Sequence, residues 1–379
     1  MLSNFAYFLA VGATLPVLPR FVEGPLGSGS VAVGMTFGAF ALSAVLLRPW
    51  VGRIGDTRGR KLLVISGGAL VAISVGAQVW ISSLGPLLLL RLLTGAGEAA
   101  FYVGVASAIN DLAPDERRGE ALSYFSLSLF AGIGLGPVLG ETVLEAISFD
   151  AAWLAAAALA ATASVTGLLL PETRPDDMEP GESARLVHPA ALIPGTVMAA
   201  SIWGLATFTA FVPLYALVIG LPGSRFLFAG HSAIVFAIRL FGARIPDRLG
   251  AQRSATGALI FSVIGFMIIG LWNEPTGLIL GMVFWSIGHS LAFPALMSMA
   301  VKAAPARERG AVVGTFTAFF DLSFGLGAVT AGGIVGVLGY RGGFLSSAVA
   351  AGAGLVLLQT RRRRQKQQGI ERAPATLSA

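Results

Sequence analysis

The segment Arg48–Lys61, RPWVGRIGDTRGRK, decides the fold of this chain because a second copy of it follows later in the sequence. The copy is Arg239–Arg253, RLFGARIPDRLGAQR, and both segments lie between long apolar runs. At an offset of 191 residues, the matching pairs are Arg48 with Arg239, Arg53 with Arg244, Ile54 with Ile245, Asp56 with Asp247 and Gly59 with Gly250. Two copies of a charged turn, each between apolar spans, indicate a duplicated membrane protein.

The composition leads to the same class of protein. Of the 379 residues, 55% are hydrophobic and 12% are charged, and the mean hydropathy is +0.78. A soluble domain carries about 25% charged residues. Apolar runs long enough to cross hydrocarbon recur along the whole chain, and the short alternating strands of a β-barrel are absent from the sequence. We therefore expect an all-α polytopic membrane protein.

Twelve apolar spans of about 20 residues or more fit the sequence, which is enough to cross about 30 Å of hydrocarbon. The polar stretch Pro171–His188 divides them six and six, and the repeat continues without a gap from the second span to the fifth. This arrangement predicts two six-helix bundles related by a pseudo-two-fold axis along the membrane normal. The expected spans are 2–21, 30–50, 62–82, 86–110, 119–141, 151–170, 190–219, 225–243, 254–272, 276–301, 310–337 and 342–360.

The domain boundaries and the orientation follow from these spans. We expect a first bundle at 1–172, a linker at 173–188, a second bundle at 189–360 and a basic, disordered tail at 361–379. Lys and Arg residues concentrate in one set of loops, which predicts a plasma-membrane protein with both termini and the linker in the cytoplasm. Topology therefore explains the net charge of +6, and no nucleic-acid partner is expected. The abrupt start of the first span leaves open that residues precede Met1.

At this point the chain resembles the major facilitator superfamily, whose turn between spans two and three reads Gly-x-x-x-Asp-Arg/Lys-x-Gly-Arg-Lys/Arg. Thr57 departs from the first basic position of that pattern. In the family, this turn closes the cytoplasmic side in the outward-facing state. The resemblance implies gate residues, although the basic turn could also serve topology alone. The implied gate residues are Gly52, Asp56, Gly59, Arg60 and Lys61, with Asp247 and Arg248 as a weaker second copy.

Two further family signatures are partly present. The fourth span carries an arginine followed by Gly-x-Gly, at Arg91, Gly95 and Gly97. The fifth span resembles a signature ending in Gly-Pro-x-x-Gly-Gly, which is typical of antiporters, but Glu141 replaces its last glycine. The matching residues are Gly132, Gly136, Pro137 and Gly140, which could form a packing surface and a hinge between the halves.

A few ionisable side chains inside the spans are the candidates for chemistry, because a charge within a membrane is costly. Glu98 lies about 18 Å into the fourth span, and Arg91 lies about two turns earlier on the same face. Asp321 lies at a similar depth, and Glu98 aligns with His289 in the repeat. We expect Arg91, Glu98, His289 and Asp321 to bind substrate and protons near the membrane midplane. Packed neutral side chains are the alternative for Glu98 and His289, as they are for His231, whose counterpart is Phe40.

The sequence therefore favours secondary transport of a small organic solute by alternating access between two bundles. We expect a monomer that exports an amphipathic compound or metabolite by proton antiport. It would be driven by the ion gradient without a bound cofactor or metal. A proton-coupled importer of a sugar or organic acid is the first alternative, and a sensor or assembly protein on the same fold is the second. A membrane enzyme is disfavoured because no phosphate loop and no catalytic cluster are visible.

Overall fold

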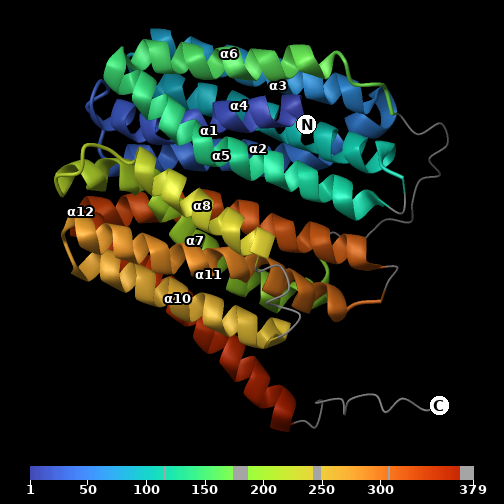
Figure 1. The fold of residues 1–379 in the computed structure, drawn as a ribbon, viewed down its shortest axis with the longest axis vertical. Coiled ribbons are helices and arrows are strands. Elements are labelled where there is room, and N and C mark those ends of the chain that lie inside the picture. Colours follow the sequence, from blue (N-terminus) through green and yellow to red (C-terminus); the bar gives the residue numbers. More distant parts are fainter. Residues whose placement is uncertain (115–116, 174–186, 242–248, 306–307, 368–379) are drawn as a thin grey trace.

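The computed structural model describes residues 1–114, 117–173, 187–241, 249–305 and 308–367. Within these ranges the chain is helical and contains no strand, so the predicted all-α fold is confirmed. The first bundle comprises α1 (Leu2–Glu23), α2 (Ser30–Arg58), α3 (Arg60–Gly76), the 3-10 helix η1 (Ala77–Trp80), α4 (Leu84–Leu112), α5 (Arg118–Ala146) and α6 (Phe149–Gly167). The second comprises α7 (Pro189–Val218), α8 (Arg225–Phe241), α10 (Ala251–Leu271), α11 (Pro275–Lys302) and α12 (Arg309–Gln367). The two bundles lie one above the other in Figure 1.

The longest helix, α12, covers the last two predicted spans. Gly339, at φ 70°, is not helical and divides α12 into two arms, 309–338 and 340–367. The second arm continues to Gln367, past the predicted start of the tail at residue 361. Among the described residues, ten helices are long and apolar enough to cross a membrane, and α8 has 17 described residues. The count of twelve membrane spans stays a prediction.

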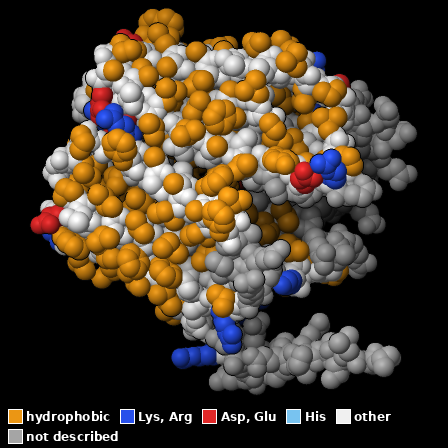
Figure 2. Space-filling model, in the orientation of Figure 1, with side chains coloured by type: hydrophobic (Ala, Val, Ile, Leu, Met, Phe, Trp, Pro, Cys, Tyr) orange, Lys and Arg blue, Asp and Glu red, His pale blue; other side chains and the backbone are white. Residues whose placement is uncertain are grey.

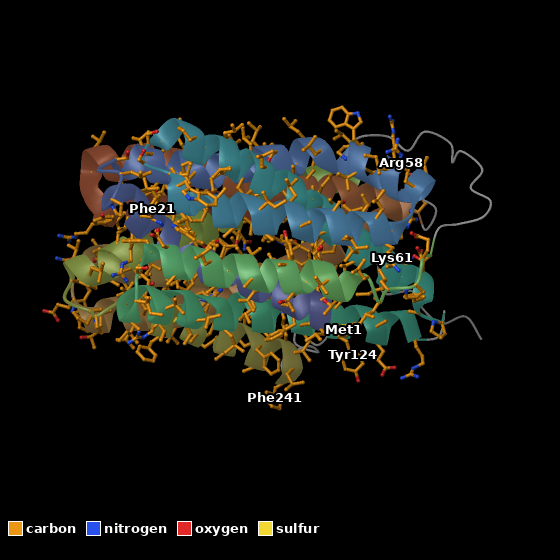
Figure 3. The ribbon with its side chains drawn as sticks, turned by 90° about the horizontal axis from the view of Figure 1, so that it is seen from above. Met1, Phe21, Arg58, Lys61, Tyr124 and Phe241 are labelled. Atoms are coloured by element: carbon orange, nitrogen blue, oxygen red, sulfur yellow. The ribbon has the colours of Figure 1, made fainter. Side chains whose placement is uncertain are left out.

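The helices run roughly side by side, so the connections between them gather at two ends (Figure 1). We call the end that carries Met1, the α2–α3 turn and the residues after α6 the linker end. The opposite end, which carries the α1–α2 turn, is the hairpin end. Figure 3 shows Arg58 and Lys61 at the linker end and Phe21 toward the hairpin end.

The surface between these two ends is apolar. Figure 2 shows hydrophobic side chains over most of the visible face, with charged side chains sparse on it. Large apolar side chains such as Ile73, Trp80 and Val349 are exposed. Water would disfavour so large an apolar area, whereas lipid would not, so this surface fits a multi-pass membrane protein.

The charged segment that opens the sequence is almost entirely helical. Helix α2 continues to Arg58 and α3 begins at Arg60, so Gly59 alone reverses the chain. Its φ of +103° favours glycine, and a Cβ atom there would collide with the carboxylate of Glu172. The turn is therefore shorter than the sequence pattern suggests, and it is fitted against the residues that follow α6.

Three glycines of the predicted hinge form the contact between α5 and α1. Gly132, Gly136 and Gly140 are spaced four residues apart, so they lie on one face of α5, next to Pro137. A Cβ atom on Gly136 would lie 2.6 Å from the Cα atom of Gly12, and added Cβ atoms at the other two glycines would also meet the α1 backbone. This surface lets the two backbones approach closely. Its role as a hinge stays a prediction.

The substitution Gly136→Ala should lower the thermal unfolding midpoint of the purified protein, because the methyl group overpacks the α1–α5 contact by about 1–3 kcal/mol. Gly257→Ala is the matched control, since nothing lies within 4 Å of a Cβ atom there. Its midpoint should stay within about 2 °C of wild type. Equal midpoints for the two variants would contradict the close α1–α5 contact.

Candidate functional site

The two bundles meet along two pairs of helices. Helix α2 packs against the first arm of α12, and α5 packs against α8. Residues equivalent in the repeat occupy these two contacts, because α2 corresponds to α8 and α5 to the first arm of α12. Each contact carries one arginine at the equivalent place of the repeat, Arg48 in α2 and Arg239 in the last described turn of α8.

Arg48 holds together carboxylates from both halves. Its Nη2 atom lies 3.6 Å from Oε1 of Glu98 on α4, and its Nη1 atom donates to Oδ2 of Asp321 on α12. The guanidinium carbon lies 5.3 Å from the centre of the Tyr102 ring. We call Arg48, Glu98, Asp321 and Tyr102 the Arg48 cluster. It contains one permanent positive charge and two groups that can carry a negative charge.

The Arg48 cluster is buried enough to make its charges costly, yet it is not sealed. The side chains of Arg48, Glu98 and Asp321 are 26%, 11% and 19% exposed. The Oε2 atom of Glu98 is buried without a hydrogen-bond partner among the described residues. Charges in such surroundings need partners of the opposite sign. When Glu98 and Asp321 are both ionised, they carry one negative charge more than the guanidinium of Arg48 can neutralise. A single proton would balance the cluster.

The structure brings together only part of the predicted midplane site. Glu98 and Asp321 both contact Arg48. No role was predicted for Arg48, although it is the first residue of the repeated segment. Arg91 also faces α2, but it donates from Nε to the Thr36 carbonyl at 3.3 Å. Its guanidinium lies 4.9 Å from the centre of the Phe40 ring, outside the Arg48 cluster.

His289 lies in the second bundle with other ring systems rather than with Glu98. Its ring centre is 5.5 Å from that of His231, and His231 stacks on Trp285 at 4.5 Å. The Nδ1 atom of His231 is 2.8 Å from the Ser286 hydroxyl oxygen. The expected single cluster is thus divided in two. Equivalent positions in a repeat lie on opposite sides of the axis that relates the halves, so Glu98 and His289 need not touch.

The predicted gate residues form a network within the first bundle at the linker end. The Arg60 side chain donates to Asp56 at 2.6 Å and to Asp111 at 3.2 Å, and its backbone N–H donates to Glu172 at 2.8 Å. This network fixes the turn against α4 and the segment after α6. Two other predicted gate residues lie nearby. Nothing lies within 4 Å of a Cβ atom placed on Gly52, and Lys61 in the first turn of α3 is partly exposed. The second copy, Asp247 and Arg248, lies outside the described residues.

Glu141 joins the two halves at the hairpin end. This residue on α5 is fully buried and accepts hydrogen bonds from the backbone N–H groups of Ser224, at 2.8 Å, and Arg225, at the start of α8. Arg20 of α1 donates to the same carboxylate at 3.2 Å. A negative charge at a helix N-terminus is favourable because unpaired N–H groups point toward it. The residue that departs from the glycine signature is therefore the one that holds α8.

Other polar contacts between the halves also lie at the hairpin end. Glu145 pairs with Arg225 at 2.6 Å, and the Tyr340 hydroxyl donates to Glu23 at 3.1 Å. At the linker end, the ion pairs of Arg60 with Asp56 and Asp111 stay within the first half. The halves are thus held together at the hairpin end in this conformation.

The family follows from the whole-chain comparison. The model of the Major Facilitator Superfamily matches residues 1–328 and, in a second match, 226–379. The chain belongs to the major facilitator superfamily. An uncharacterized MFS-type transporter of Burkholderia mallei is 27% identical over 364 residues, which cover 93% of this chain and 89% of that protein. This superfamily member is accordingly an integral membrane transporter, and its relatives are not enzymes.

Solved structures share the fold at low sequence identity. A bacterial homolog of the human lysosomal transporter Spinster, in an inward-facing and occupied conformation, superposes with a TM-score of 0.80 at 14% identity. That likeness covers 96% of this chain and 95% of the homolog. The human organic anion transporter MFSD10 gives a TM-score of 0.70 at 20% identity, with 94% and 97% covered. At these identities the likeness supports the fold of this superfamily member.

Removing the Glu141 carboxylate should loosen the contact between the halves at the hairpin end. The chain has no cysteine, so Ser224→Cys provides a single buried reporter next to Glu141. In that background, Glu141→Ala should raise the rate of maleimide labelling at least about five-fold, because α8 loses several charge-assisted hydrogen bonds. Glu274→Ala, an exposed acid at the same end, is the control. Equal labelling rates of the Ser224→Cys reporter with and without the Glu141→Ala substitution would show that Glu141 does not hold the halves together.

Proposed function

We propose that this protein is a proton-coupled secondary transporter that exports a small amphipathic solute by alternating access. The observation that carries the proposal is the Arg48 cluster, in which one arginine binds a carboxylate from each half. The α2–α12 contact therefore includes an ion pair whose strength depends on bound protons. Proton binding and the relative position of the halves are linked through this pair.

The proposed coupling step follows from charge balance. When Glu98 and Asp321 are both ionised, Arg48 is attracted to both halves. A proton on Asp321 removes its negative charge, so the attraction between α2 and α12 weakens while Glu98 keeps Arg48 in the first bundle. Tyr102 lies beside the same guanidinium.

The orientation of the transporter is part of the proposal. The bias of Lys and Arg toward the linker end favours a cytoplasmic location for that end and for both termini. With the hairpin end held by Glu141, the described conformation would then correspond to a monomer open toward the cytoplasm. The Arg60 network would act as the gate by keeping the α2–α3 turn rigid when the linker end closes. The glycine surface of α5 would serve as the hinge.

The test uses wild-type protein in liposomes that contain a pH-sensitive dye. Solutes from a panel of amphipathic anions, cations and neutral compounds are added, and solute-dependent proton movement is recorded. Wild type should show this movement with at least one solute. Asp321→Asn and Glu98→Gln should each lower its rate at least about ten-fold and flatten its dependence on pH, because the Arg48 cluster loses a proton site.

Asp150→Asn is the control, because this exposed acid lies in the first turn of α6, away from the Arg48 cluster. Its proton movement should match wild type. Solute flux with unchanged pH dependence in both cluster variants would remove the proton role. Solute accumulation in the opposite direction would support import, and the absence of any flux across the panel would favour a non-transporting role.

A further inference from the structure

The contact between α5 and α8 carries a second cation in the place that corresponds to Arg48. Subtracting the offset of 191 from Arg239, His289 and Asp321 gives Arg48, Glu98 and Phe130. Arg48 meets a carboxylate of each half, whereas Arg239 meets an aromatic ring of the other half. Its guanidinium carbon lies 4.0 Å from the centre of the Phe130 ring, across the interface between the halves.

Arg239 and His289 each carry a nitrogen atom that has no hydrogen-bond partner in the described part of the chain, as Arg48 also does at Nε. Arg239 Nε and His289 Nδ1 are buried without a hydrogen-bond partner among the described residues. His289 lies on α11, which packs against α8, the helix that carries Arg239. No carboxylate of the described residues forms an ion pair with Arg239, although each carboxylate of the Arg48 cluster pairs with Arg48. A buried polar atom without a partner costs free energy, and Arg239 Nε can only donate, so an acceptor from outside the chain would be favourable beside it.

The balance of charge in the middle of the bundle points to the same position. The described residues there include three arginines, Arg48, Arg91 and Arg239, and two carboxylates, Glu98 and Asp321, which leaves one positive charge. Arg91 already donates to a backbone carbonyl and faces an aromatic ring. Neither Arg91 nor Arg239 has a carboxylate partner among the described residues, and Arg239 Nε also lacks the backbone acceptor that Arg91 has, so a negative charge would be most favourable beside Arg239.

The surroundings of Arg239 are suited to an amphipathic ligand. Arg239, His231 and His289 are each partly exposed although they lie within helices. The rings behind them are closely packed, since His231 stacks on the fully buried Trp285, and the ring centre of Phe208 lies 4.4 Å from that of Trp285. A charged group can thus reach the guanidinium while an apolar group lies beside rigid ring systems.

We propose that Arg239 and His289 bind the anionic group of the transported solute, which makes the substrate an amphipathic monoanion such as a carboxylate. This inference rests on the proposed function as a solute transporter. It assigns different tasks to two equivalent places in the repeat. The Arg48 cluster exchanges protons, and the Arg239 site receives the anion.

The experiment measures binding to the purified full-length protein in detergent, by thermal shift and titration calorimetry. The probes are 1-naphthoate and octanoate as anions, 1-naphthamide as the neutral analogue and 1-naphthylmethylamine as the cation. At least one anion should bind wild type at least about ten-fold more tightly than the neutral and cationic probes. Arg239→Gln should weaken anion binding at least about ten-fold, and His289→Gln about three- to ten-fold.

Three further variants separate this site from mere packing and from the proton role. Arg239→Lys keeps the charge and should preserve the preference for anions, and Phe130→Leu should change anion affinity by less than about three-fold. Asp321→Asn should keep anion binding while its proton movement in liposomes is lost, so that either proposal can fail alone. The inference is overturned if both anions fail to bind, if the cation binds more tightly, or if Arg239→Gln and His289→Gln bind the anion as wild type does.

Discussion

A single guanidinium between two carboxylates, one from each half, is the interaction around which this transporter is arranged. Arg48 lies where a charge is costly, so Glu98 and Asp321 are needed as its partners. Since α4 and α12 belong to different bundles, satisfying this charge also ties the bundles together. Because Arg48 has few other partners, the α2–α12 contact is sensitive to protonation: the loss of one negative charge weakens the attraction across the interface.

The two halves share equivalent helix positions through the repeat, but the side chains at several of these positions differ. Arg48 and Arg239 keep equivalent places, but Asp321 corresponds to Phe130 and Glu98 to His289. A carboxylate pairs with a guanidinium by charge, whereas Phe130 offers only a ring face, which is a weaker partner. The α2–α12 contact therefore contains an ion pair, and Arg239 in the α5–α8 contact has no carboxylate partner among the described residues. A symmetric scaffold thus acquires two sites with different electrostatic properties.

The sequence was informative where a pattern is local and less so where helices meet. Apolar length and the repeated turn predicted the helices and the two bundles, and Glu98 and Asp321 could be picked out as charges inside spans. Nothing in the local pattern shows which way a helix is rotated against its neighbour, so the pairing of Arg48 with Asp321 was missed. The role of Glu141 could not be predicted because two of its partners are backbone N–H groups, which leave no sequence signal.

The contacts along α8 connect the hairpin end with the interior. Glu141 holds the first residues of α8, and Phe130 faces Arg239, which lies 14 positions after Arg225 and about 21 Å along the same helix. Both partners come from α5, so α5 and α8 touch through polar or charged groups at two depths. A helix moves as a rod over this length, and a rotation that opens the hairpin end must also change the distance between Arg239 and Phe130. An anion bound beside Arg239 and the contact that Glu141 makes at the hairpin end would therefore act on the same two helices, α5 and α8.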